Sequence, residues 1–298
     1  MPAGHSIIGS VDPDLRSLQH LRSALFVPLA DERFIAKAHQ RGADALLLDL
    51  EDSVPPAQKA QARARLGDAA RKLTTAGALV MVRINSVPEH LAEDLKAAAQ
   101  SSVSAVFLPK VESAEQVVAA EFMLKGSNAG IVAMLESPAS VLDAAAIARA
   151  GTRLAGLAFG SEDYCGLLGI ASDKAALDWP AQMVAVAARA RGLAAFGLPG
   201  PVSEIADMGA YARLLEKAKA MGYTGCTCIH PKQVAEANRV YSLSAEELAL
   251  AREIVEAFDA AVKEGRGAFA LHGRMIDAPV ADQARATLAR AGGQTRTQ

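Results

Sequence analysis

The sequence has few aromatic residues and a small net charge. The first indicates the kind of fold, and the second limits the possible binding partners. Aromatic residues make up 4% of the 298 residues, although hydrophobic residues make up 51%. This composition favours Ala-, Leu- and Val-rich helices packed on a sheet. The formal net charge of −2 provides no bulk attraction to nucleic acid or to an anionic membrane surface. We therefore expect neither a nucleic-acid partner nor a membrane partner.

Cysteine is also scarce, and long apolar runs are missing. Cys165, Cys226 and Cys228 are an odd number without the spacing of a disulfide framework, which favours a reducing compartment. The stretch Met1–Arg16 lacks the apolar core of a signal peptide. No segment reaches the ~18 uninterrupted apolar residues of a membrane helix. The sequence predicts a cytoplasmic protein.

What the sequence does contain is an alternation of short apolar runs with longer helical patterns. Such runs are typical of buried parallel strands. The alternation predicts about eight strand–helix units, the number that closes a (β/α)8 TIM barrel, an α/β fold, rather than leaving an open sheet. The predicted strands are Ala24–Val27, Ala45–Leu48, Leu79–Ile84, Ala105–Leu108, Gly130–Leu135, Leu154–Phe159, Leu193–Leu198 and Gly225–Ile229.

The chain is long enough for one barrel and a C-terminal helical extension, because a barrel needs ~250 residues. We expect the barrel, as a catalytic domain, over residues 20–240 and the extension over residues 241–298. After the sixth strand we expect a Gly-containing loop and then a helix around Pro180–Arg191. In the extension, Ser244–Lys263 is a predicted helix that begins with a capping box. The Gly-rich and then polar stretch Gly265–Pro279 must cover the mouth of the barrel or reach a neighbouring subunit.

Two acids follow neighbouring strands of the predicted barrel. Glu136 comes directly after the fifth strand, and Asp163 lies shortly after the sixth, beside Ser161 and Glu162. Carboxylates on adjacent strand ends can share one hard cation, and Mg²⁺ is usually held by one or two carboxylates plus waters and substrate oxygens. Either acid alone could instead cap a helix or pair with an arginine. The two together favour a metal site.

Arg83 ends the third predicted strand and offers a planar fork to a carboxylate or an enolate oxygen. It could instead pair with Asp49 or Glu51 on the adjacent strand end, and both roles can hold together. The stretch Asp49–Asp52 is so dense in negative charge that some of its acids must be paired, be protonated or lie just behind the metal.

Three further groups have both a catalytic and a structural interpretation. His230 could be a general base, but its position before a proline is typical of a helix N-terminus. Cys226 and Cys228 lie two apart on a strand and face the same side, so burial inside the barrel is favoured over metal binding. Lys110 could form a Schiff base, but its neighbour Glu112 and the nearby acids favour a salt-bridged role.

Eight short motifs, in order from about residue 22 to residue 280, resemble the citrate lyase β-subunit-like branch of the HpcH/HpaI aldolase superfamily. No single motif is specific, but the ordered set is a strong signal. The motifs are Arg22–Pro28 (RSALFVP), Asp49–Val54 (DLEDSV), Arg83–Ser86 (RINS), Leu108–Glu112 (LPKVE), Glu136-Ser137, Phe159–Tyr164 (FGSEDY), Ile229–Pro231 (IHP) and Gly273–Asp277 (GRMID).

The resemblance implies a Mg²⁺-dependent barrel lyase that breaks or forms a C–C bond β to a coenzyme A thioester. Its substrate would be of the citryl-, malyl- or citramalyl-CoA type, and its products an acyl-CoA such as acetyl-CoA and a 2-oxo acid. Glu136 and Asp163 would bind Mg²⁺, and Glu136 would also face the substrate. Arg83 would be catalytic and would hold the substrate carboxylate or the enolate oxygen. Asp277 would be a catalytic acid/base donated by a neighbouring subunit, which implies a homo-oligomer, commonly a trimer or a dimer of trimers.

The same resemblance assigns contacts to the two halves of the substrate. Phe26, Arg33 and Lys37 fall where the family touches coenzyme A, and Thr227 and Cys228 fall where it contacts the rest of the substrate. The chain departs from the family pattern at Leu29, where a glycine is common, and in the loop over residues 197–202, where many members are acidic. That loop lines the mouth of the barrel, so the identity of the acyl group is open.

Two alternatives to this function remain. A 2-oxo-acid aldolase of the same superfamily would act on a free pyruvate-type acid and an aldehyde, but it would not need the tail Gly273–Asp277 as a lid. A non-catalytic subunit or regulator would bind coenzyme A without turnover. Such a protein has no need for an acid/base Asp277 beside Glu136, Asp163 and Arg83.

Overall fold

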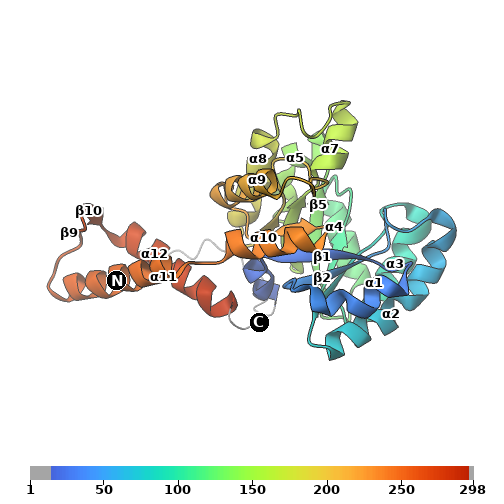
Figure 1. Ribbon diagram of the computed structural model, residues 1–298, viewed down its shortest axis with the longest axis horizontal. Helices are drawn as coiled ribbons and strands as arrows, with labels where there is room; N and C mark the ends of the chain where they lie inside the picture. The colour runs from blue at the N-terminus through green and yellow to red at the C-terminus, as the bar shows by residue number, and fades with distance from the viewer. Residues whose placement is uncertain (1–14, 295–298) are drawn as a thin grey trace. The chain divides into compact units, whose positions relative to one another are not determined.

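Eight parallel strands form the centre of the computed structural model, which describes residues 15–294 (Figure 1). The strands are β1 (Ser23–Pro28), β2 (Ala45–Asp49), β3 (Leu79–Arg83), β4 (Ala105–Leu108), β5 (Gly130–Leu135), β6 (Leu154–Phe159), β7 (Ala194–Phe196) and β8 (Cys226–Cys228). They pair in the order β7-β6-β5-β4-β3-β2-β1-β8. A parallel bridge between Phe196 of β7 and Gly225, just before β8, nearly closes the sheet into a barrel. The predicted TIM-barrel fold is confirmed.

The strands form where the sequence is continuously apolar, because both faces of a parallel barrel sheet are buried. Every residue of β5 and β6 is buried. The bounds of β4, β5 and β6 are those predicted, and the other strands differ by one or two residues at an end. Inside the barrel Phe107 and Phe196 pack with their ring centroids 5.8 Å apart.

Helices alternate with the strands and cover the outside of the barrel (Figure 1). In α2 the buried side chains recur at helical spacing, which turns one apolar face toward the sheet. The α-helices of the barrel are α1 (Glu32–Lys37), α2 (Lys59–Thr75), α3 (Pro88–Ala99), α4 (Ala114–Met123), α5 (Pro138–Leu142), α6 (Ala144–Ile147), α7 (Ser161–Leu168), α8 (Asp178–Arg189), α9 (Met208–Met221) and α10 (Pro231–Tyr241). Short 3-10 turns lie at Leu15–His20 (η1), Ala38–Arg41 (η2) and Pro56–Gln58 (η3).

Helix α7 corrects the expectation of a loop after the sixth strand. Its first turn contains Glu162 and Asp163, whose negative charges favour a helix N-terminus. It ends at Gly169, which has a left-handed backbone with φ of 67°. Both are helix signals in the sequence, but the helix spans only eight residues.

The chain divides into two compact units, of which the first ends at Tyr241 and the second begins at Ser242. The second unit consists of α11 (Ala245–Lys263), a hairpin of β9 (Phe269–Leu271) and β10 (Arg274–Ile276), and α12 (Ala278–Gln294). The capping box predicted at the start of α11 is confirmed. The hairpin and α12 are not predicted from the sequence. The hairpin turns at His272 and Gly273, whose φ values of 48° and 76° are those a two-residue type I′ turn requires.

Three further expectations can be compared with the described residues, two of them directly. Within residues 15–294, no helix is long and apolar enough to cross a bilayer. The cysteines Cys165, Cys226 and Cys228 are free and buried. The stretch Met1–Arg16, for which no signal peptide is expected, lies outside the described residues except at its last two positions.

Candidate active site

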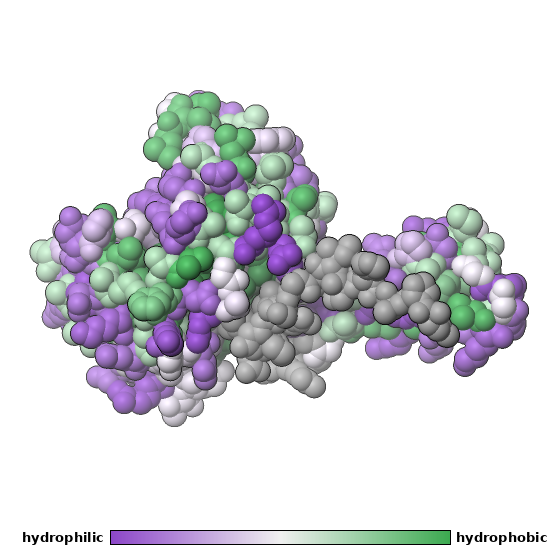
Figure 2. All heavy atoms as spheres, turned by 180° about the vertical axis from the view of Figure 1, so that it is seen from behind, coloured by the Kyte–Doolittle hydropathy of each residue, from purple (hydrophilic) through white to green (hydrophobic). Residues whose placement is uncertain are grey.

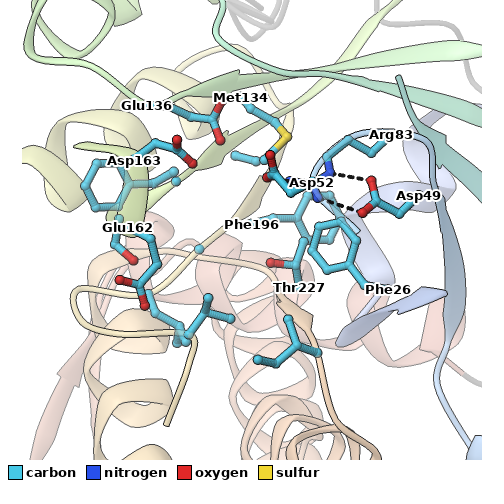
Figure 3. A pocket seen from close by; sticks show the side chains of 18 of the residues that line it. Phe26, Asp49, Asp52, Arg83, Met134, Glu136, Glu162, Asp163, Phe196 and Thr227 are labelled. Carbon is cyan, nitrogen blue, oxygen red and sulfur yellow. Dashed lines mark hydrogen bonds and ion pairs between the residues drawn. The ribbon is translucent and has the colours of Figure 1, made fainter. Parts of the chain in front are cut away.

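A pocket of about 440 Å³ opens where the barrel strands end (Figure 3). Residues at or just after the carboxyl ends of seven of the strands line it, and the active sites of this fold lie at that face. An adjoining pocket of about 560 Å³ shares Glu136, Glu162 and Asp163 with it and reaches Leu167 at the end of α7. Leu167 is exposed, and hydrophobic side chains gather at the upper edge of the barrel unit in Figure 2.

Glu136 and Asp163 point into the same space in the pocket (Figure 3). Glu136 follows β5 and is 4% exposed, and Asp163 lies in the first turn of α7. Burial raises the pKa of Glu136 to about 7, and the charges of Asp163 and Glu51 add to the effect. A cation between the two carboxylates would relieve this repulsion and favour the ionised form of Glu136.

The chemistry of this donor pair fits Mg²⁺. Within residues 15–294, no three or more His, Cys, Asp or Glu side chains gather as a metal cluster. A structural zinc site would need such a set. Mg²⁺ needs only one or two carboxylates, with waters and substrate oxygens as its other ligands. Glu136 and Asp163 supply two hard oxygen donors of this kind, and their role as metal ligands stays a prediction.

Two backbone features fix the carboxylate of Glu136. Lys110 has a left-handed backbone with φ of 53°, which is uncommon outside glycine, and its N–H donates to Glu136 Oε2 at 2.7 Å. Gly160 approaches from the end of β6. A Cβ at this position would lie 2.6 Å from both Cγ and Oε1 of Glu136. Any side chain at Gly160 would therefore displace the carboxylate.

Arg83 is the centre of a buried ion-pair network. Its Nε and Nη2 donate to the two carboxylate oxygens of Asp49, both at 2.8 Å. Its Nη1 lies 3.0 Å from Asp52 and 3.1 Å from Glu51. The guanidinium carbon also lies 4.6 Å from the ring centroid of Phe26. The pairing that the sequence offered as an alternative is thus present, while the guanidinium still lines the pocket.

The dense acids at and just after the end of β2 are partly paired and partly shifted in pKa, as expected. Burial alone would raise the pKa of Asp49, but the hydrogen bonds and the charge of Arg83 leave it below its ordinary value. Burial raises the pKa of Glu51. Lys110 Nζ lies 3.3 Å from Glu51 Oε1, so the salt-bridged interpretation of this lysine is confirmed, with Glu51 rather than Glu112 as the partner.

The strand β8 separates its three side chains between two environments. Thr227 lines the pocket. Cys226 and Cys228 are fully buried, and their sulfurs lie 3.5 Å and 4.0 Å from the hydroxyl of Tyr211 on α9. The predicted burial of these cysteines is confirmed, but their sulfurs face the helix layer rather than the inside of the barrel, because alternate residues of a strand face opposite sides. The side chain of Cys228 faces the helix layer and is not among the residues that line the pocket.

His230 has the structural role that its position predicts. Its Nδ1 accepts the N–H of Lys232 at 3.1 Å, in the first turn of α10. Gln233, three residues further on, is a positioning residue that the sequence does not predict. The Gln233 side chain is fully buried, and its Oε1 accepts the N–H groups of Ile229 at 2.8 Å and His230 at 3.1 Å. It is a buried amide near the start of a helix, and no local pattern distinguishes it from a surface glutamine.

The three residues expected to contact coenzyme A lie on or just after β1. Phe26 lines the pocket. Arg33 and Lys37 are exposed on α1 and do not line it. Arg33 pairs with Asp31, the N-cap of that helix, at 2.6 Å. Their contact with coenzyme A stays a prediction.

Asp277 lies in the second unit, at the start of α12. Its Oδ1 accepts the N–H of Val280 at 3.3 Å, and its carbonyl accepts that of Ala281 at 3.0 Å. This is the geometry of a helix N-cap. Capping is the structural alternative to the acid/base role that the sequence resemblance implies, and the two need different tests.

The chain belongs to the HpcH/HpaI aldolase/citrate lyase family, which residues 22–231 match. The predicted family is thereby confirmed. Citrate lyase subunit beta of Escherichia coli (strain K12) is 33% identical over 291 residues, which cover 93% of this chain and 95% of that protein. Mitochondrial citramalyl-CoA lyase of Homo sapiens is 33% identical over 288 residues, 90% of this chain and 84% of that one.

The structure of CitE from Mycobacterium tuberculosis in complex with magnesium, acetoacetate and coenzyme A is similar as a whole. It has a TM-score of 0.72 and 33% sequence identity, and the match covers 91% of this chain and 97% of that one. The likeness therefore extends beyond the segment that matches the family.

Proposed function

We propose that this protein is a Mg²⁺-dependent carbon–carbon lyase of the CoA-thioester type. It cleaves, or in reverse forms, a β-hydroxyacyl-CoA of the citryl, malyl or citramalyl class, with an acyl-CoA and a 2-oxo acid as products. The observation that carries the proposal is the carboxylate pair of Glu136 and Asp163 facing one pocket with Arg83. The named activities of the relatives and the magnesium and coenzyme A of the CitE complex support it.

Cleavage needs a base for the β-hydroxyl and stabilisation of the enolate that the acyl half becomes. Mg²⁺ held by Glu136 and Asp163 would act as a Lewis acid on the hydroxyl and carboxylate end of the substrate. Arg83 faces the pocket with its guanidinium already fixed by Asp49. A donor fixed before the reaction needs no reorganisation when charge develops, so Arg83 would stabilise the enolate oxygen.

The remaining roles come from other parts of the chain. Phe26, Arg33 and Lys37 would contact coenzyme A, and Thr227 the acyl portion. Asp277, supplied by the second unit of a neighbouring copy, would move the proton at the acyl carbon. This arrangement requires a homo-oligomer, for which the resemblance implies a trimer or a dimer of trimers. The scarcity of cysteine favours a reducing compartment such as the cytoplasm.

The second unit has properties that suit this role. Among the described residues, its hydrophobic cluster has three buried members, Phe258, Ile276 and Ala281. A cluster of this size seldom stabilises an independent unit, so packing against another surface is favoured. The resemblance assigns that surface to a second copy of the chain.

Product analysis tests the proposed activity against its alternatives. Purified protein with Mg²⁺ is incubated either with the CoA thioesters or with free 2-oxo acids and aldehydes, and the products are identified by mass spectrometry. Acyl-CoA formation from a thioester by this chain alone supports the lyase. Turnover of free acids only would indicate the aldolase, and no turnover of either would indicate a non-catalytic subunit.

Complementation tests the shared site. Arg83→Ala and Asp277→Ala proteins are each expected to be nearly inactive, and subunit exchange should create some sites that contain both residues. Partial recovery of lyase activity in the mixture is the expected result. A mixture that stays inactive after proven exchange, or a wild-type monomer that is active, would refute a site shared between subunits.

A further inference from the structure

Charged and uncharged residues line opposite arcs of the pocket. The ends of β2, β3, β5 and β6 carry all of its charged side chains. The next three strands around the barrel, β7, β8 and β1, contribute an arc in which, among the described residues, Thr227 has the only polar side chain. The principal residues of this uncharged arc are Phe26, Phe196, Leu198, Val202, Thr227 and Ile229.

Buried and partly buried hydrogen bonds connect the uncharged arc to the rest of the barrel. Gly200, in the loop after β7, accepts a hydrogen bond from Ser161 Oγ at 2.7 Å. Gln233 Nε2 donates to the carbonyl of Val202 at 2.7 Å, and Gln233 Oε1 accepts the N–H of Ile229 at 2.8 Å. One buried amide therefore ties both halves of the apolar wall.

A second carboxylate on the substrate would have no counterion at this wall. Among the described residues that line the pocket, Arg83 is the only cation, and it is already surrounded by Asp49, Glu51 and Asp52. Lys110 lines the adjoining pocket and pairs with Glu51. A carboxylate desolvated against an apolar wall without a partner is strongly disfavoured, whereas an alkyl group gains from the same burial.

We propose that the 2-oxo acid of this enzyme carries a single carboxylate and an alkyl substituent of one or more carbons. This rests on the proposed lyase function. The carboxylate and the oxo group lie on the charged arc, and the alkyl group lies against Leu198, Val202 and Ile229. In cleavage, the electron pair of the C–C bond goes to the acyl carbon, which then takes up a proton. The hydroxyl gives up its proton and becomes the oxo group.

Four thioesters that differ only at the hydroxyl-bearing carbon test this selectivity. Their substituents are hydrogen, methyl, ethyl and carboxymethyl, so that they release glyoxylate, pyruvate, 2-oxobutanoate and oxaloacetate. We expect kcat/KM for the methyl and ethyl substrates to exceed that for the carboxymethyl substrate by ~10²-fold or more, the scale on which pocket contacts discriminate substrates. A carboxymethyl or hydrogen substrate that matches or exceeds the alkyl ones would overturn the proposal.

A binding measurement separates this selectivity from the activity itself. Titration calorimetry of the Mg²⁺-loaded protein with free 2-oxobutanoate and free oxaloacetate should give a Kd for oxaloacetate that is ~10-fold higher or more. The reverse order would overturn the selectivity. Failure to cleave any of the four thioesters would instead overturn the proposed lyase, whatever the binding order.

Variants of the wall identify the residues responsible. Val202→Arg adds a counterion, so we expect the preference for ethyl over carboxymethyl to fall by ~10-fold or more. Val186→Arg on the exposed face of α8, outside the pocket, is the matched control and should leave the preference unchanged. Ile229→Ala is a second variant without an added charge. It should lower kcat/KM for the ethyl substrate more than for the hydrogen substrate. Wild-type preferences in both wall variants would show that this wall does not select the substrate.

Discussion

Replacement of Glu136 by glutamine should stabilise the metal-free protein above pH 7 and abolish its response to Mg²⁺. Glutamine has the shape of a protonated glutamate, and its Oε1 can still accept the N–H of Lys110, which lies 2.7 Å from Glu136 Oε2. It carries no charge next to Asp163. The variant therefore removes the repulsion in the metal site without removing the local hydrogen bond.

The size of the effect follows from the pKa of Glu136, which burial raises from 4.5 to about 7. A carboxyl whose folded pKa is raised binds more protons in the folded than in the unfolded state between these two values. The stability of the folded state consequently falls as pH rises from 4.5 through 7 and stays low above that. The difference between the two pKa values corresponds to ~3 kcal/mol of lost folding stability, and the glutamine variant does not lose it. For a chain of this length that is a rise in Tm of roughly 5 °C.

Thermal unfolding at pH 5 and pH 8, each in EDTA and in Mg²⁺, measures this effect. In EDTA, wild type and Glu136→Gln should differ more at pH 8 than at pH 5. Mg²⁺ should raise the Tm of wild type at pH 8 by mass action and leave the variant unchanged. The exposed Glu256→Gln on α11 is a control that should behave as wild type. A variant that is less stable than wild type in EDTA at pH 8, or equally stabilised by Mg²⁺, would refute the reasoning.

Three further substitutions, the first with a control, test other proposed roles. Gly160→Ala should lower Mg²⁺ affinity, measured by calorimetry, and kcat/KM by ~10²-fold or more, because the added Cβ lies 2.6 Å from Glu136 Cγ. Gly67→Ala, on the exposed face of α2 and with nothing within 4 Å of the added carbon, should leave both unchanged. Arg83→Lys should lower kcat/KM by ~10²-fold or more because it loses the fork, and wild-type kinetics would reduce Arg83 to an ion-pair partner. Asp277→Asn keeps an N-cap and should unfold at the wild-type denaturant midpoint while nearly inactive; an active variant would leave only the capping role.

The barrel could be predicted because its signals are local. Each strand is a short apolar run, and burial on both faces makes the run continuous, as in β5 and β6. The carboxyl ends of parallel strands meet at one face, so the strand-end positions of Glu136 and Arg83 placed them at the mouth of the barrel. Both line the same pocket.

The missed features depend on short elements or on contacts between distant segments. The strands β9 and β10 have three residues each, too few for a periodic pattern. The close approach of Gly160 to Glu136 and the left-handed backbone of Lys110 join the ends of three different strands. The outward direction of Cys228 depends on the phase of a strand that is only three residues long. No local sequence pattern contains this information.

Metal removal with product analysis tests the central claim most directly. Wild-type protein with the methyl-substituted β-hydroxyacyl-CoA should release acyl-CoA and pyruvate in equal amounts with Mg²⁺. Product release should stop when EDTA is added and resume when Mg²⁺ is in excess again. Asp163→Asn, which removes one of the two proposed metal ligands, should release neither product at any Mg²⁺ concentration that saturates wild type. Full turnover of wild type in excess EDTA, or wild-type turnover by Asp163→Asn, would contradict a magnesium-dependent lyase built on Glu136 and Asp163.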